Sequence, residues 1–163
     1  MYGTANISPC GRYRYTLRRV WDAALPEVSF IMLNPSTADA ETDDPTIRRV
    51  VGFARSWGFG SVSVFNLFAL RATDPSELFR TVKAQEETGG PENDRVLASI
   101  PADRVVVAAW GTWAEEFTAR ERYVRDMFKG RLRCLGLTKD GHPRHPLYVR
   151  ADTQHQEFPE RAS

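Results

Sequence analysis

The feature that most constrains the fold is a short apolar run that leads into a polar loop and then into a helix signal. Residues 28–33 are almost all apolar, as in a buried strand, and the run stops at Asn34-Pro35, residues that break strands. Asp44-Pro45 is typical of a helix start, with aspartate as the N-cap and proline in the first helical position. Open α/β sheets bind their ligands where a strand leads through such a loop into a helix.

Strand and helix patterns alternate along the rest of the chain. Residues 105–109 are apolar throughout, so this strand is expected to be covered on both faces. The alternation predicts an α/β fold, a single three-layer α/β/α domain with a central, mainly parallel sheet. The strands are expected at residues 13–21 (an edge strand), 28–33, 61–66, 104–109 and 132–137, and the helices at 45–57, 76–79, 92–100 and 113–128.

Length and composition are those of one globular domain. With 163 residues, 42% of them hydrophobic, the chain can bury a core without disulfides or a metal. We expect a single domain over residues 1–163, with residues 1–10 and 151–163 peripheral to it. The formal net charge of +1 argues against strong non-specific binding to duplex nucleic acid, which needs a concentrated positive surface.

The sequence also predicts a cytoplasmic protein. No apolar run approaches the roughly 18 residues of a membrane span, and the N-terminus has neither the basic start nor the apolar core of a secretory signal. Cys10 and Cys134 lie far apart without a CxxC spacing, which favours reduced thiols over a disulfide. We therefore expect no membrane contact, and the sequence leaves the oligomeric state open.

Polar and aromatic residues follow each of the core strands. Asn34 and Asn66 come at the ends of the first two, Trp110-Gly111 follows the third, and the loop 142–146 follows the fourth. Since the carboxyl ends of parallel strands share one edge of the sheet, these residues are expected to line one cleft. Four loops from distant parts of the chain indicate a site more strongly than any single motif.

Asn34 and Asn66 are the first candidates for binding chemistry. An amide donates and accepts hydrogen bonds at once, so it can orient a water molecule or read the edge of a nucleobase. Either residue can instead close a turn on its own backbone. Phe68, two residues after Asn66, either stacks on a base or covers the core.

His142 and His145 lie in a His-Pro-Arg-His-Pro segment. The two prolines disfavour the helical geometry that would place a pair of zinc ligands. A histidine at the mouth of a sheet is better suited to hydrogen-bond a developing oxyanion, or to act as an acid or base near neutral pH. We therefore expect neither a metal nor another cofactor.

The acidic segment 39–44 allows a different chemistry. Asp39, Asp43 and Asp44 could hold Mg²⁺ in a metal-dependent hydrolase, although helix capping and solvated loop charges account for them more simply. Arg48 lies in the first turn of the predicted helix, where a cation is unfavourable. This position favours contact with an anion such as phosphate.

Several blocks of the sequence resemble an uncharacterised bacterial and phage family, the domain-of-unknown-function family numbered 1643. They span nearly the whole chain in a specific order, but the family name specifies no activity. The blocks are residues 32–39, residues 44–49, residues 66–71 with Asp74-Pro75, Trp110-Gly111 and the His-Pro loop.

More distantly, the same layout resembles the uracil-DNA glycosylase superfamily. The segment 33–36 matches the Asn-Pro of its first motif, which implies a water-positioning role for Asn34. Asn66 matches the base-reading asparagine after the second core strand. His145-Pro146, or His142-Pro143 in another register, matches the last motif. The glycines that flank the Asn-Pro of the superfamily are absent here, as is a cysteine cluster for an iron–sulfur site.

This second resemblance implies a nucleobase-recognising protein of uracil-DNA-glycosylase-like fold that hydrolyses the N-glycosidic bond of a modified or non-standard base. Asn34 and His145 would be catalytic. The partner would be nucleic acid with a single-stranded or flipped base, or a free nucleotide. A non-catalytic binder of such a base and the metal-dependent hydrolase stay open as alternatives. The expected substrate-binding residues are Pro35, Ser36, Asn66, Phe68, Trp110, Gly111, His142, Arg144 and Arg48.

Overall fold

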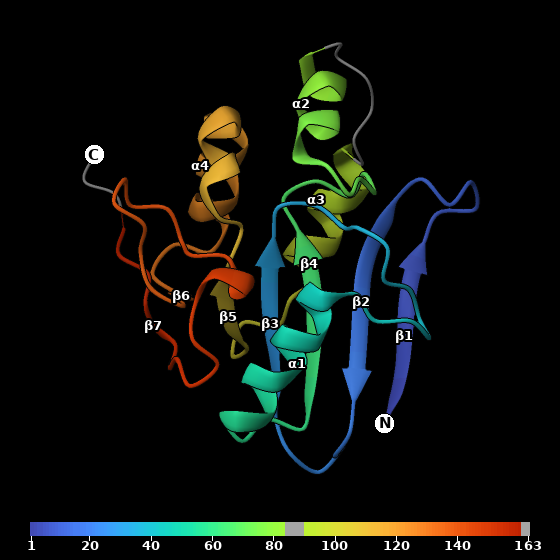
Figure 1. The fold of residues 1–163 in the computed structure, drawn as a ribbon, viewed down its shortest axis with the longest axis vertical. Coiled ribbons are helices and arrows are strands. Elements are labelled where there is room, and N and C mark those ends of the chain that lie inside the picture. The colour runs from blue at the N-terminus through green and yellow to red at the C-terminus, as the bar shows by residue number, and fades with distance from the viewer. Residues whose placement is uncertain (84–89, 161–163) are drawn as a thin grey trace.

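The computed structural model describes residues 1–83 and 90–160, which form a mixed α/β fold around a seven-stranded sheet (Figure 1). The strand order is β1-β2-β4-β3-β5-β6-β7. The strands are β1 (Tyr2–Ile7), β2 (Arg14–Val20), β3 (Glu27–Met32), β4 (Ser61–Asn66), β5 (Val105–Ala108), β6 (Leu132–Cys134) and β7 (Gln156–Glu157). The helices are α1 (Pro45–Ser56), α2 (Pro75–Lys83), α3 (Gly90–Ala98) and α4 (Thr118–Met127), with short 3-10 helices η1 (Thr112–Phe117) and η2 (Pro146–Tyr148).

Four parallel strands, β4, β3, β5 and β6, form the centre of the sheet. Val28 of β3 lies between Val62 of β4 and Val105 of β5, so the predicted strands 28–33 and 104–109 are direct neighbours. The outer strands β1, β2 and β7 pair antiparallel, so the expectation of a mainly parallel sheet holds for the centre and is wrong for the edges. Two parallel neighbours need a long connection, usually a helix, to bring the chain back to the same end of the sheet. The described chain has no α-helix before β3 or between β6 and β7, so the outer strands pair antiparallel.

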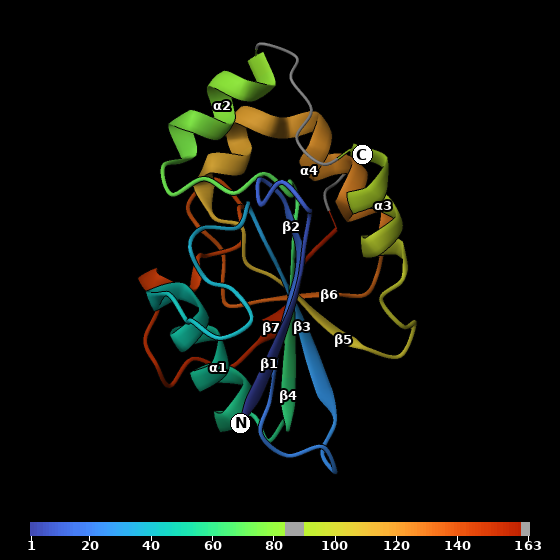
Figure 2. The same ribbon diagram turned by 90° about the vertical axis from the view of Figure 1, so that its right-hand side faces the viewer.

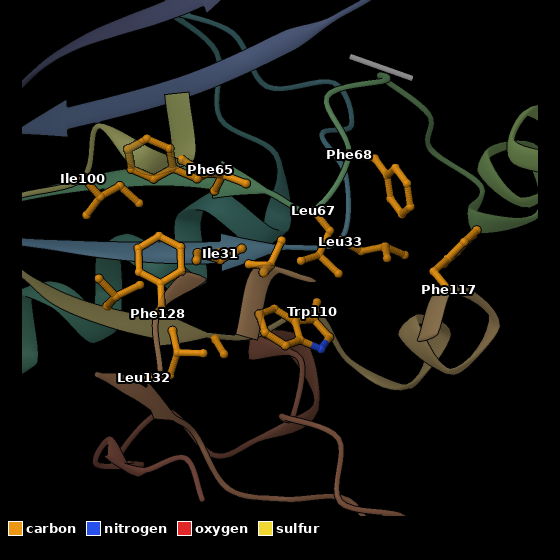
Figure 3. Packing of buried hydrophobic residues seen from close by; sticks show 14 of the residues in the cluster. Ile31, Leu33, Phe65, Leu67, Phe68, Ile100, Trp110, Phe117, Phe128 and Leu132 are labelled. Carbon is orange, nitrogen blue, oxygen red and sulfur yellow. The ribbon is translucent and has the colours of Figure 1, made fainter. Parts of the chain in front are cut away.

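Helices cover both faces of the sheet, with α1 on one side and α3 on the other (Figure 2). Since side chains alternate along a strand, Phe30 and Ile31 of β3 belong to different hydrophobic clusters. Phe30 packs in the cluster of α1, which includes Ile47. Ile31 packs in the cluster of α2, α3 and α4, which contains Phe128 and extends to Trp110 (Figure 3).

Two predicted elements are shorter in the structure than in the sequence analysis. The helix expected at 113–128 is divided into η1 and α4, because Phe117 leaves helical geometry with φ −129° and ψ 42°. β6 ends at Cys134 and does not continue to residue 137. Gly136, just beyond it, has a φ of 115°, which does not occur in a strand.

The terminal segments, expected to be peripheral, contribute edge strands. Residues 2–7 form β1 against β2, so the strand expected at 13–21 is not the edge strand that the sequence predicts. Beyond Arg150, where the sequence predicts no element, β7 pairs with β6 and the buried Phe158 packs in the core. Backbone pairing and one buried aromatic side chain are enough to order a segment that is otherwise polar.

Neither cysteine is in a disulfide. Cys10 is an exposed free thiol, and Cys134 is a buried one. In residues 1–83 and 90–160, no helix has the length and apolarity that crossing a membrane requires.

Asp44 forms the N-cap of α1 that the sequence predicts. Its Oδ1 accepts a hydrogen bond of 2.9 Å from the backbone N–H of Ile47, and Pro45 opens the helix. We expect Asp44→Ala to lower the free energy of unfolding by about 1 kcal/mol, because a helix-terminal N–H loses its partner. Urea unfolding measures this, with Asp44→Asn as the control that keeps a capping acceptor. Equal losses in both variants would show that the charge, and not the cap, is responsible.

Candidate functional site

The loops that follow β3, β4, β5 and β6 meet at the carboxyl edge of the parallel strands. Together with the first turn of α1 they surround a cavity of about 690 Å³. This volume is within the usual range of small-molecule sites, roughly 300–1,000 Å³. The cavity is lined by seven of the residues expected in a nucleobase site, Asn34, Ser36, Asn66, Trp110, Gly111, Arg144 and His145, and by Asp44 of the alternative metal site.

The other four residues expected in the nucleobase site do not line this cavity. Phe68 belongs to the core, where it packs edge-to-face on Phe117 with ring centroids 5.0 Å apart (Figure 3). Of the two roles considered for Phe68, covering the core is the one observed. Pro35 is buried beside the cavity, Arg48 is exposed, and His142 is buried behind the cavity wall.

Asn34 follows β3, and backbone carbonyls hold its side-chain amide. Its Nδ2 lies 2.9 Å from the carbonyl oxygen of Ala72, 3.2 Å from that of Leu70 and 3.1 Å from that of Pro35. These acceptors determine which way the amide is oriented, because only its nitrogen can donate. The acceptor atom Oδ1 is therefore the group that Asn34 can offer to a ligand or water in the cavity.

Asn66 ends β4 and differs from the other polar residues of the cavity. It is 0% exposed, and neither its Nδ2 nor its Oδ1 has a hydrogen-bond partner among the described residues. Its backbone is held by pairing with Met32 of β3 and by Asn93, whose Nδ2 donates to the Asn66 carbonyl at 3.0 Å. Leaving a buried polar group unpaired costs about 1–3 kcal/mol. Such groups are rare in proteins and call for an explanation.

His145 lies at the start of η2 and has a defined tautomer. Its Nδ1 accepts a hydrogen bond of 3.2 Å from the backbone N–H of Leu147, so the proton of the neutral ring is on Nε2. Burial lowers the pKa of His145 below its ordinary value of 6.5, although Asp44 opposes this effect. At neutral pH His145 is therefore an uncharged donor. Gly111 packs beside it, where an added Cβ would lie 3.4 Å from the Cβ of His145.

The lowered pKa of His145 gives stability a pH dependence of known sign. Between the folded pKa and the unfolded value of 6.5, the unfolded chain binds more protons than the folded one. The contribution of His145 to the free energy of unfolding is thus complete above pH 6.5 and is lost as the pH falls through the folded pKa. We expect the wild type to lose more stability between about pH 7 and pH 5 than His145→Asn, which keeps a capping acceptor but does not titrate.

Urea unfolding of both proteins across this pH range measures the difference. The comparison is needed because burial also lowers the pKa of His155. An identical pH dependence in the wild type and in His145→Asn would contradict the assignment.

Trp110 forms part of the cavity wall, and a buried polar network holds it in place. Its Nε1 donates to Oε2 of Glu121 at 3.0 Å, and the same oxygen lies 3.3 Å from Nδ1 of His142. All three residues are buried. His142 therefore supports the wall without touching the cavity. Glu121 has no sequence signal that marks this role, because a carboxylate on a predicted amphipathic helix has the same pattern as a solvated surface charge.

Arg14, Trp113 and Tyr148 also line the cavity and were not expected to do so. Arg14 belongs to β2, where the alternating pattern predicts a solvated face, yet it is only 2% exposed. Trp113 and Tyr148 are exposed and lie where the cavity opens to solvent. A single sequence has no signal that separates an arginine lining a cavity from one facing solvent.

The aspartates of the alternative metal site have structural partners. The carboxylate of Asp39 accepts two backbone N–H groups of its own loop, which lowers its pKa. Asp43 forms a 2.9 Å ion pair with Arg19, and Asp44 caps α1. Across the described ranges, no group of three or more His, Cys, Asp or Glu side chains is arranged to hold a metal ion. The geometry thus favours capping and loop-stabilising roles for these carboxylates.

Comparison with known proteins gives a match to one family model. The model, described as "Protein of unknown function (DUF1643)", matches residues 14–147. This range includes every residue named above as lining the cavity except Tyr148. Neither the curated proteins nor the solved structures give a match.

Proposed function

Since the chain belongs to the family described as "Protein of unknown function (DUF1643)", which specifies no activity, we propose a function from the cavity itself. The protein recognises a nucleobase and hydrolyses its N-glycosidic bond, in nucleic acid or in a nucleotide. The observation that carries this proposal is the buried, unpaired amide of Asn66 in a cavity of about 690 Å³.

The amide of Asn66 is suited to the edge of a heterocyclic ring. It offers a donor and an acceptor side by side, and nucleobase edges present the matching acceptor and donor. The free protein already bears the cost of the unpaired amide, so a ligand that pairs it recovers that free energy. A ligand that lacks the matching groups does not, and is rejected. Trp110 adds an apolar, rigidly held wall to the same cavity.

Two further residues of the cavity supply what glycosidic hydrolysis requires. The transition state resembles an oxocarbenium ion, so the reaction needs a positioned water and a donor to the departing base. The Oδ1 of Asn34 is available to accept a hydrogen bond from that water. The Nε2–H of neutral His145 can hydrogen-bond the negative charge that develops on the base. The resemblance to the uracil-DNA glycosylase superfamily implies the same two roles and supports this assignment.

A non-catalytic binder of a modified base is the second candidate, and one observation favours it. The Nδ2 of Asn34 already bonds the carbonyls of Leu70 and Ala72, so Asn34 joins the loop after β3 to the chain after β4. This structural role accounts for Asn34 without a catalytic role, which is what a binder requires. Turnover is therefore the property that separates the two candidates.

Release of free base tests the proposal. The protein is incubated with single-stranded DNA, duplex DNA, RNA and nucleotides that carry modified bases, and free base is quantified by chromatography. We expect release from one of these substrates by the wild type, and loss of release in Asn34→Ala measured on folded protein. A base that binds without release in either protein would favour the binder. No binding and no release over the whole panel would overturn the proposal.

A further inference from the structure

Arg14 is a buried cation that is only partly paired. It lines the cavity, and its Nη1 donates to the carbonyl oxygen of Ala38 at 2.9 Å. Its Nε is buried and has no hydrogen-bond partner among the described residues. A buried guanidinium donor without an acceptor is costly, so an oxygen atom supplied by a ligand would stabilise it.

The charged groups around Arg14 carry an excess of positive charge. Asp44 is the carboxylate that acts favourably on Arg14, whereas Arg71 and Arg19 repel it. Arg19 is itself paired with Asp43, so these five side chains sum to three positive and two negative charges. Burial lowers the pKa of Arg14 to about 10, which still leaves it charged at neutral pH. A negatively charged oxygen therefore matches this region better than a neutral one.

Arg14 and Asn66 reach the same cavity from neighbouring strands. β2 pairs with β4, and the backbone N–H of Arg14 donates to the carbonyl of Ala69, just beyond the end of β4. Six residues with hydroxyl groups, which can donate to the remaining oxygens of an anion, also line the cavity: Ser36, Thr37, Thr46, Thr73, Thr112 and Thr138.

We propose that Arg14 forms a phosphate subsite in this cavity, and that the ligand whose base is read by Asn66 is a nucleotide. The inference rests on the proposed function, to which it adds the anionic part of the ligand. It also assigns Arg14 as a specificity-determining residue that favours phosphorylated over unphosphorylated nucleosides.

Inorganic phosphate is the first probe. In ¹⁵N spectra of the wild-type protein, the Nε–H signal of Arg14 should shift saturably on titration with phosphate. We expect Arg14→Met to weaken phosphate binding by at least about 10-fold. The matched control is Arg71→Met, because Arg71 donates to the carbonyls of Ser36 and Thr37 but does not line the cavity. Its affinity for phosphate should fall much less than that of Arg14→Met, because Arg71 adds positive charge to the region but no donor inside the cavity.

Nucleosides and their monophosphates are the second probe. For each nucleoside monophosphate that the wild type binds, we expect an affinity at least about 10-fold higher than for the unphosphorylated nucleoside. In Arg14→Met this difference in affinity should disappear. If Arg14→Met does not fold, the wild-type Nε–H shift and the monophosphate advantage decide the question without a variant.

The outcomes separate the subsite from the proposed function. Absence of phosphate binding in the wild type, or equal binding in Arg14→Met, overturns the subsite. Nucleosides that bind through Asn66 with no gain from phosphate overturn the subsite alone and leave the proposed function standing. Phosphate binding that depends on Arg14, with no nucleoside or base binding, supports the subsite and contradicts the proposed function.

Discussion

Asn66→Leu is expected to raise the stability of the protein while removing its affinity for a base. Leucine is similar in shape to asparagine but has no polar side-chain atoms, so the substitution removes a buried amide that has no hydrogen-bond partner among the described residues. We expect the free energy of unfolding to rise by about 1 kcal/mol. Affinity for the base should fall by at least about 10²-fold, because both polar contacts are lost. Urea unfolding and titration calorimetry measure the two effects.

Asn93 supplies the matched control, because it is buried close to Asn66 and its amide nitrogen is used. The Nδ2 of Asn93 donates to the carbonyls of Asn66 and Leu67. Asn93→Leu should lower the free energy of unfolding by about 1 kcal/mol, since it leaves backbone acceptors without this donor. If Asn66→Leu destabilises the protein as Asn93→Leu does, Asn66 has a structural role and the binding assignment fails.

His145→Ala is expected to lower kcat by at least about 10²-fold on a substrate that the wild type cleaves. KM should change little, because the Nε2–H of His145 acts on charge that develops in the transition state. Steady-state kinetics with single-turnover measurements separate binding from the chemical step. A variant with unchanged kcat would remove His145 from the catalytic assignment.

His142→Asn distinguishes the two registers in which the His-Pro motif can be placed. His142 contacts Glu121 in the network that holds Trp110, so its replacement should mainly lower stability and raise KM by shifting the cavity wall. The kcat of His142→Asn should fall much less than the kcat of His145→Ala. The reverse order, with kcat lost in His142→Asn and kept in His145→Ala, would assign the catalytic role to His142.

The positions of the strands and of the candidate residues at their ends could be predicted from short-range patterns. The apolar run at 105–109 and the Asp44-Pro45 helix start depend only on neighbouring residues, and both appear in the structure as β5 and the N-cap of α1. The end of each parallel strand then follows from the topology, so the loops after Asn34 and Asn66 meet at one edge. The edges of the sheet were harder to predict, because the strands there pair without helical crossovers.

The side-chain environments could not be predicted in this way. His142 and His145 are three residues apart and each precedes a proline, yet one is buried against Glu121 and the other lines the cavity. Arg14 has the pattern of a surface residue but is buried in the same cavity.

Local sequence patterns are thus sufficient to specify the secondary-structure elements of the parallel core and the edge of the sheet at which the candidate loops meet. Which polar groups of the cavity are paired, and which are left for a ligand, depends on contacts that form when the chain folds. The partners of Asn34 come from residues 70 and 72, and the unpaired state of Asn66 depends on every residue around it. A helix cap such as Asp44 pairs with a neighbouring residue and can be predicted locally, but the pairing of Asn34 and Asn66 depends on groups from distant parts of the chain, so no local pattern indicates it.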